Sequence, residues 1–317
     1  MRPFSSKKKF VPCAVRHVRR FKFARAARRR ESIGVLQPKK LLKTSFLNVD
    51  GLSEITLDDV SSTIKVRNLD VVFLVESKRR EEETPIDAFI PGYALHESRR
   101  SNLAGDKAGG GIMVYTKLTD GVLFKRYTPD IQEPEDNFIN SERVWITVES
   151  LACKTAVCGL YLGYQDSSDK HGAWNDSIYR VVQQEAFTLR SKGYRVCFLG
   201  DFNGHTGNRL GEGVPGNTPD INPNGRRFFS FLANTDSRHI NGECRVPGQV
   251  NTMITKGLWT RQRGGHSSVI DYGTISREHL NSVVAMEIDD QGVYGGGGTT
   301  TGSFLTSPTG LLRSEEF

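Results

Sequence analysis

The chain has 317 residues, of which 37% are hydrophobic and 25% charged, proportions typical of a soluble globular protein. That length fits one large domain or two small ones. No run of eighteen apolar residues occurs, and no apolar core follows the first basic residues, so the sequence predicts neither a membrane span nor a secretory signal. The five cysteines are scattered and include no CxxC pair, which argues against a zinc site.

The net charge of +7 is unevenly distributed along the chain. Residues 1–43 hold fifteen Lys or Arg residues and one acid, Glu31, for a net charge of +14, whereas the remainder carries −7. A segment of this composition tends to be disordered and to attract anions. We interpret residues 1–40 as a disordered basic arm suited to nuclear import or to nucleic-acid phosphates. A solvated tail and a mitochondrial presequence are the alternatives.

From residue 41 onward, apolar runs alternate with stretches of helical spacing. Leu41 to Leu47 predicts a strand, and residues 54–67 predict a helix that Ser53 would cap. The continuous apolar run at 70–75 predicts a strand buried on both faces. The remaining predictions, in chain order, are strands at 112–115, 144–148 and 155–162, a helix at 173–191, a strand at 195–199, a long loop at 203–224, a short helix at 226–232, and strands at 268–275 and 282–288.

This alternation, with no second linker, predicts a single α/β domain over residues 41–290. Residues 291–317 break the pattern, because they are low in complexity and contain too few apolar residues to predict a strand. We interpret them as a degenerate or disordered tail.

Polar side chains stand where three predicted strands end, namely at Asn48, at Glu76 and at Asp201 with Asn203. Sites in α/β sheets assemble at the carboxyl ends of strands. Carboxylates accompanied by an amide suit a hard, oxygen-preferring cation such as Mg²⁺. Each residue alone would be read as a turn former, and their joint occurrence favours a metal site.

Five motifs occur in a recognisable order: Ser45–Leu52, Leu74–Lys78, Leu160–Leu162, Gly200-Asp201-Phe202-Asn203 and Ser268-Val269-Ile270-Asp271-Tyr272. Their order resembles the endonuclease/exonuclease/phosphatase superfamily, and most closely the endonuclease domains of non-LTR retrotransposons. The resemblance implies a four-layer α/β sandwich, in which two packed β-sheets are flanked by helices.

The resemblance also implies residue roles. Glu76, assisted by Asn48, would bind Mg²⁺, with Mn²⁺ as the alternative. Asp201 would orient or deprotonate the attacking water, Asn203 would position that water, and Tyr161 would contact the scissile phosphate. These roles agree with the chemistry, because a metal ion neutralises developing charge and a nearby carboxylate accepts a proton from water.

One motif of the family is missing. The family ends with Ser-Asp-His after a glycine-rich turn, and the acid of the Ile-Asp-Tyr motif supports that His. Here the turn at 294–298 is followed by Thr299-Thr300-Thr301-Gly302 and no Asp-His. Asp271, the fourth implied catalytic residue, therefore lacks its expected partner. His266 and His279 flank it in sequence, but His279 is expected at the wrong end of a strand.

His205 is a candidate accessory group in the loop that continues from the Gly200-Asp201-Phe202-Asn203 motif, called the signature loop below. The loss of one positioned donor to the phosphate costs about 2.7–4 kcal/mol in the barrier, so we expect impaired turnover.

The leading functional prediction is Mg²⁺-dependent phosphodiester hydrolysis of nucleic acid, DNA rather than RNA, by a nuclear protein. The alternatives are a phosphatase acting on lipids or nucleotides, and a degenerate protein that binds nucleic acid without cleaving it. Basic pairs that we place on loops, Arg99-Arg100 and Arg226-Arg227, together with Lys107, are candidate contacts to a phosphate backbone.

Overall fold

The computed structural model describes residues 41–52, 54–79, 85–99, 110–119, 122–129, 142–149, 154–164, 169–207, 209, 219–241, 260–263, 266–289 and 301–306. The basic arm at 1–40, the predicted helix cap at Ser53 and the glycine-rich turn at 294–298 lie outside these residues.

Six strands form the first sheet, in the order β13-β14-β1-β2-β4-β3. Only β1 and β2 run parallel among its neighbouring pairs, and helix α1 (Glu54–Arg67) connects them. The strands are β1 (Leu42–Asn48), β2 (Val71–Val75), β3 (Tyr93–Ser98), β4 (Ile112–Lys117), β13 (Val283–Asp289) and β14 (Thr301–Thr306). A 3-10 helix, η1 (Pro85–Ala88), precedes β3.

The second sheet also has six strands, in the order β5-β6-β7-β8-β12-β9. Its parallel pair is β7 and β8, which helix α3 (Asp169–Ser191) connects. The strands are β5 (Leu123–Tyr127), β6 (Arg143–Glu149), β7 (Lys154–Tyr161), β8 (Arg195–Asp201), β9 (Ser237–His239) and β12 (Asp271–Ser276). The other elements are helix α5 (Pro223–Asn234), the two-stranded hairpin β10 (Arg261–Arg263) and β11 (His266–Ser268), and the 3-10 helix η2 (Arg277–Ser282).

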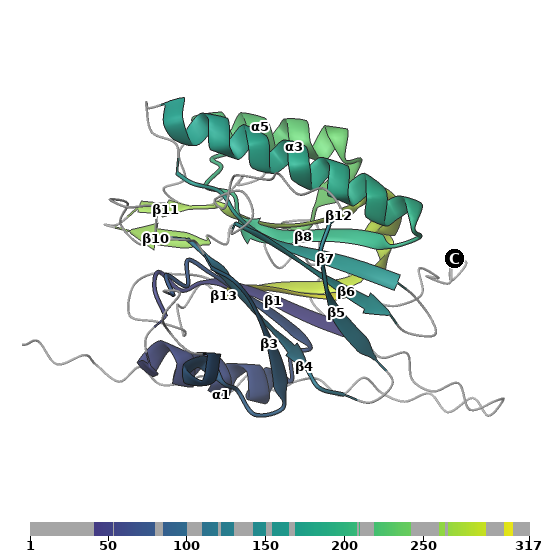
Figure 1. Cartoon of the computed structure of the whole chain (residues 1–317). Coiled ribbons are helices and arrows are strands. Elements are labelled where there is room, and N and C mark those ends of the chain that lie inside the picture. Colours follow the sequence, from purple (N-terminus) through teal and green to yellow (C-terminus); the bar gives the residue numbers. More distant parts are fainter. Residues whose placement is uncertain are drawn as a thin grey trace, which may run out of the picture. The chain divides into compact units, whose positions relative to one another are not determined.

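The two sheets pack face to face, with helices on both outer faces (Figure 1). Between the sheets lies a core that includes Phe46 and Phe73 from the first sheet and Ile146 and Val157 from the second. Helix α1 packs on the outer face of the first sheet, while α3 and α5 cover the second. This is the predicted four-layer α/β sandwich. No helix in the described ranges is long and apolar enough to cross a membrane.

Local sequence accounts for the main elements. All five residues of β2 are buried, as its continuous apolar run predicted, because one face packs on α1 and the other on the second sheet. Helix α3 buries its predicted apolar face, formed by Ile178, Val181, Val182, Ala186 and Leu189.

The tail prediction is wrong for residues 301–306. Strand β14 lies between β1 and β13 and pairs antiparallel with both, so the sheet extends beyond the predicted domain end at 290. A strand between two others satisfies its backbone donors and acceptors on both edges. It therefore needs no continuous apolar run, which is why the sequence pattern did not predict it.

Gly159 on β7 marks a close approach between the two sheets. A Cβ placed on Gly159 would come within 2.2 Å of Cδ1 of Phe73, whose ring is buried on β2. Gly273 on β12 offers a matched control, since a Cβ there would meet its nearest atom, Leu199 Cδ2, at an ordinary 3.4 Å.

We predict that Gly159→Ala lowers the free energy of unfolding by about 1–3 kcal/mol, because overpacking forces the sheets apart. Gly273→Ala should leave it nearly unchanged. Urea denaturation of the two variants and the unaltered chain measures both effects, and equal midpoints for all three proteins would contradict the close packing described here.

Candidate active site

The predicted site residues from both sheets meet at one edge of the sandwich. Asn48 ends β1, and Glu76 directly follows β2, its parallel neighbour. In the second sheet, Tyr161 at the end of β7 pairs in register with Asp201 at the end of β8. Asp201 in turn pairs with Asp271, the first residue of the antiparallel strand β12. The register of the strands thus places Tyr161, Asp201 and Asp271 side by side.

A hydrogen bond joins the two halves of the site. Asn48 Nδ2 donates to Asp201 Oδ2 at 3.1 Å, across 153 residues of sequence. The backbone N–H of Asn203 donates to the other oxygen, Asp201 Oδ1, at 2.8 Å. Asp201 is only 3% exposed, so these two donors compensate for part of the cost of burying its carboxylate.

Glu76 and Asn203 both adopt left-handed backbone conformations, with φ values of 52° and 45°. Such a conformation costs about 1–3 kcal/mol in a non-glycine residue and persists where the surroundings enforce it. At Glu76 the backbone carbonyl accepts from Gly51 N at 2.8 Å, which ties the turn after β2 to the turn after β1. Strain at two site residues is typical of functional positions.

Burial and neighbouring negative charges raise the pKa values of Asp201 and Asp271. Burial raises the pKa of Asp201 to about 7, the charge of Glu76 adds to this, and the bonds from Asn203 and Asn48 oppose it. The pKa of Asp271 is raised in the same direction by burial and by the charge of Asp201. Burial, followed by the charges of Glu76 and Asp201, raises the pKa of Tyr161, whose hydroxyl bonds to Glu76. Tyr161 is therefore a protonated donor at neutral pH.

The loop after β8 is held by Asn222, which the sequence analysis did not single out. Its Nδ2 donates to the carbonyl of Asn203 at 2.9 Å, while its Oδ1 accepts from His205 N at 2.9 Å and from Gly225 N at 2.7 Å. Asn222 is thus the N-cap of α5 and a brace for the signature loop. Asn followed by Pro223 at the first helical position is an N-terminal signal that could have revealed this role.

The side chain of Asn203 is oriented by the backbone of the neighbouring strand. Its Nδ2 donates to the carbonyl of Leu162 at 2.7 Å. Oδ1 of the same amide has no hydrogen bond within the described part of the chain. That oxygen is the acceptor that remains for a water molecule.

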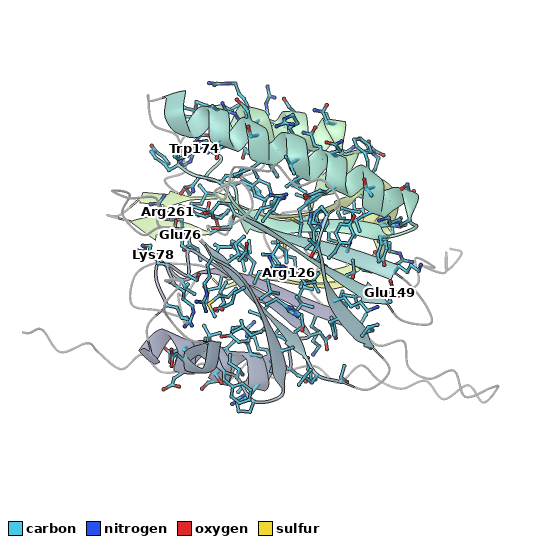
Figure 2. All side chains as sticks on the ribbon, viewed as in Figure 1. Glu76, Lys78, Arg126, Glu149, Trp174 and Arg261 are labelled. Carbon is cyan, nitrogen blue, oxygen red and sulfur yellow. The ribbon has the colours of Figure 1, made fainter. Side chains whose placement is uncertain are left out.

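Arg261 is a basic residue of the site that the sequence did not indicate. Figure 2 shows it on the same edge of the molecule as Glu76 and Lys78. Its charge opposes the rise in the pKa values of Asp201 and Asp271. Arg261 lies ten residues before Asp271 in a short hairpin, and no motif marks it.

Asp271, which the sequence leaves without its expected histidine partner, also has an unpaired carboxylate oxygen among the described residues. Its Oδ1 is buried and has no hydrogen-bond partner among the described residues. His279 lies in η2, after the far end of β12, as predicted, and cannot replace the missing histidine. The side chain of His266 and residues 290–300 lie outside the described residues. His205 is half-buried, and burial and the charge of Arg261 lower its pKa.

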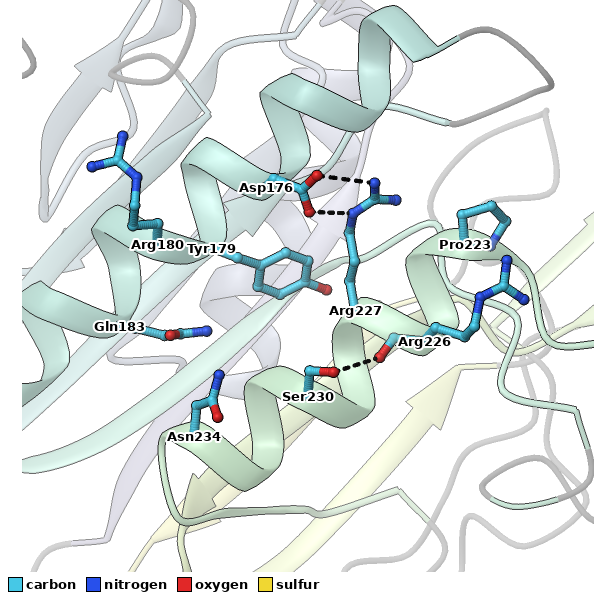
Figure 3. Close-up of a pocket in the computed structure, with 9 residues that line it drawn as sticks. All are labelled: Asp176, Tyr179, Arg180, Gln183, Pro223, Arg226, Arg227, Ser230 and Asn234. Carbon is cyan, nitrogen blue, oxygen red and sulfur yellow. Dashed lines mark hydrogen bonds and ion pairs between the residues drawn. The ribbon is translucent and has the colours of Figure 1, made fainter.

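A groove of about 530 Å³ lies between α3 and α5 and involves none of the predicted catalytic or metal-binding residues (Figure 3). Arg226 and Arg227 line it from the first half of α5, so the prediction that they lie on a loop is wrong. The helix predicted at 226–232 begins three residues earlier, after the Asn222 cap. Arg227 pairs with Asp176 at 2.6 Å. Of the other predicted backbone contacts, Arg99 pairs with Glu97 at 2.6 Å, and Arg100 and Lys107 lie outside the described residues.

Comparison with known proteins identifies the fold. No protein-family model and no curated protein matches the sequence. An AP endonuclease from Leishmania major matches with a TM-score of 0.68 and 13% identity, over 86% of this chain and 89% of that one. The endonuclease domain of the telomere-specific non-LTR retrotransposon TRAS1 matches with 0.55 and 11%, over 84% and 99%.

A 3′ phosphatase from Neisseria, bound to a product DNA hairpin, matches with a TM-score of 0.58 and 16% identity, over 84% of this chain and 99% of that one. The chain has the fold of these enzymes. The architecture predicted from the likeness to the endonuclease/exonuclease/phosphatase superfamily is thereby confirmed. The sequence identities are too low to transfer the roles of individual residues to this chain.

The raised pKa of Asp201 predicts a pH dependence of stability. Between its ordinary value of 3.8 and about 7, the folded chain keeps a proton that the unfolded chain has released. The free energy of unfolding therefore falls as pH rises through this window, by about 1.4 kcal/mol per unit. We expect Asp201→Asn to be more stable than the unaltered chain in EDTA, by a margin that grows from pH 5 to pH 8.

Denaturant titrations of both proteins at a series of pH values measure this margin. The amide cannot titrate, so the variant is the reference for all ionisable groups except Asp271 and Tyr161, whose pKa values the charge of Asp201 raises. A margin that stayed constant across the range would mean that Asp201 titrates normally in the folded chain.

Proposed function

We propose that this chain is a Mg²⁺-dependent phosphodiesterase that cleaves nucleic acid, with DNA as the substrate. The observation that carries the proposal is Asp201: a buried carboxyl with a pKa of about 7, hydrogen-bonded by Asn48 and Asn203 and adjacent to further acids. A general base works best when its pKa is near the operating pH. Burial at the edge between two sheets gives Asp201 that property.

The donor set fits a magnesium ion. Glu76 supplies a carboxylate, and Asn48 supplies an amide oxygen that also accepts from Asp50 N at 3.0 Å. Asp271 has a buried oxygen with no partner in the described residues. Among those residues, no three His, Cys, Asp or Glu side chains are grouped closely enough to hold an ion by themselves. Mg²⁺ in proteins often takes only one or two carboxylates and keeps several waters, so this sparse set suits it better than zinc.

Each residue has a role that follows from its contacts. Glu76 and Asn48 would hold the cation, which when bound neutralises charge on the phosphate. Asp201 accepts a proton from the attacking water, and Asn203 Oδ1 orients that water, since its Nδ2 is engaged by the Leu162 carbonyl. Tyr161 keeps its proton and bonds to Glu76; it would donate to a phosphate oxygen instead once Glu76 holds the cation. Burial and the charge of Asp201 raise the pKa of Asp271, so Asp271 keeps a proton beside Asp201.

The solved structures that share the fold support nucleic acid as the substrate. Two of them are endonucleases, and the third is a 3′ phosphatase bound to a DNA hairpin. Because of this phosphatase, hydrolysis of a phosphate monoester is a second candidate reaction at the same site. Non-catalytic binding of nucleic acid is the remaining alternative.

The test is cleavage of two DNA substrates in Mg²⁺ and in EDTA, one a supercoiled plasmid and the other a duplex with a 3′-phosphate. We expect Mg²⁺-dependent nicking of the plasmid, and a loss of at least about a hundredfold in Asp201→Asn and Glu76→Gln, by analogy with the removal of single charged or donor groups from other active sites. Asp59→Asn, an exposed carboxylate change on α1, is the matched control and should retain full activity.

Each outcome separates the candidates. Release of phosphate from the duplex without nicking would favour the phosphatase. Binding without either reaction would favour the non-catalytic protein. Nicking that persists in Asp201→Asn or in EDTA would contradict the proposed mechanism.

A further inference from the structure

Arg261 lies near the acids of the candidate site and yet forms no ion pair with any described residue. Other basic side chains nearby or in the interior are engaged. Lys78 pairs with Asp50 and lies 3.9 Å from Glu76, and Arg143 pairs with Glu185 at 2.8 Å. Within the described part of the chain, Arg261 therefore differs from them, because its guanidinium has no ion-pair partner there.

The backbone next to Arg261 is held in place by hydrogen bonds. The preceding residue, Thr260, donates its N–H to the carbonyl of Ser268 at 3.0 Å. Its Oγ1 accepts from the N–H groups of Ile270 and Asp271 at 3.0 and 3.1 Å. These bonds fix the start of β10 relative to the start of β12. The position of Arg261 is thus set by the same turn that places Asp271 in the site.

A half-buried, unpaired guanidinium beside buried acids is suited to an anion that arrives with the substrate. Arginine presents several N–H donors in a planar fork that matches two phosphate oxygens. The acids alone would repel a phosphodiester, and Tyr161 offers a single neutral donor. Arg261 adds positive charge to this acidic site before a metal ion binds.

We propose that Arg261 binds a non-bridging oxygen of the scissile phosphate and stabilises the charge that develops there during cleavage. This inference rests on the proposed function, since it assigns a residue to the same site. It would also give the chain a means of contacting the phosphate although the sequence lacks Ser-Asp-His.

The test compares Arg261→Gln and Arg261→Lys with Arg238→Gln, a matched change of an exposed arginine on β9. Cleavage of the Mg²⁺-loaded full chain is measured as kcat and KM on a duplex oligonucleotide. We expect Arg261→Gln to lower kcat by about 100- to 1000-fold. Arg261→Lys should recover part of the loss because it keeps the charge, and Arg238→Gln should match the unaltered chain.

A second readout does not depend on turnover. Binding of the same duplex is measured against salt concentration, with Ca²⁺ in place of Mg²⁺. Loss of one phosphate contact reduces the slope of log K against log salt by about one. We expect this reduction in Arg261→Gln and no change in Arg238→Gln. A purely structural role for Arg261 would alter stability and leave this slope unchanged.

The outcomes distinguish the two proposals. If the unaltered chain cleaves and Arg261→Gln cleaves equally well with the same salt slope, the role of Arg261 is overturned and the proposed function stands. If the unaltered chain binds but does not cleave, the proposed function fails, and the slope alone decides for or against the phosphate contact. If it binds no duplex at all, both proposals fail.

Discussion

The hydrogen bond from Asn48 to Asp201 is the contact on which the site depends, because it joins residues from two different sheets. Neither sheet contains a complete site. The first contributes Asn48 and Glu76, and the second contributes Tyr161, Asp201 and Asp271. Their separation is set by the core between the sheets, where Gly159 allows the ring of Phe73 to approach β7. The packing of the core between the sheets therefore determines the geometry of the site.

Burial at this junction also determines the chemistry. A carboxylate loses hydration when it is buried, and a neighbouring carboxylate raises the cost of ionising it. Asp201 experiences both effects, and its pKa is raised to about 7 although Asn48 and Asn203 bond to it. A site with this surplus of negative charge favours cations. The two cationic groups proposed here are a divalent metal ion bound by Glu76 and Asn48, and the guanidinium of Arg261.

The sequence predicted those features that depend on local patterns. The apolar run of β2 predicted a strand buried on both faces, and the spacing in α3 predicted its buried face. The site acids could be predicted because each ends or begins a strand, and strand register then brings them together. Strands β3 and β5 were missed because they are edge strands, with few fully buried residues and no apolar run. Strand β14 was missed because backbone pairing with β1 and β13 stabilises it, and the sequence therefore shows no apolar run there. The proximity of Arg261 depends on the hairpin and on the Thr260 bonds, which no local pattern encodes.

The most direct test of the central claim is the pKa of the Asp201 carboxyl, followed by NMR in protein with ¹³C-labelled aspartate side chains and assigned with Asp201→Asn. The account predicts a pKa of about 7 in EDTA and a lower value in Mg²⁺, because a cation held by Glu76 and Asn48 favours the ionised form. A pKa near 4 in EDTA, or one that Mg²⁺ does not change, would contradict a buried acid cluster that binds a divalent cation.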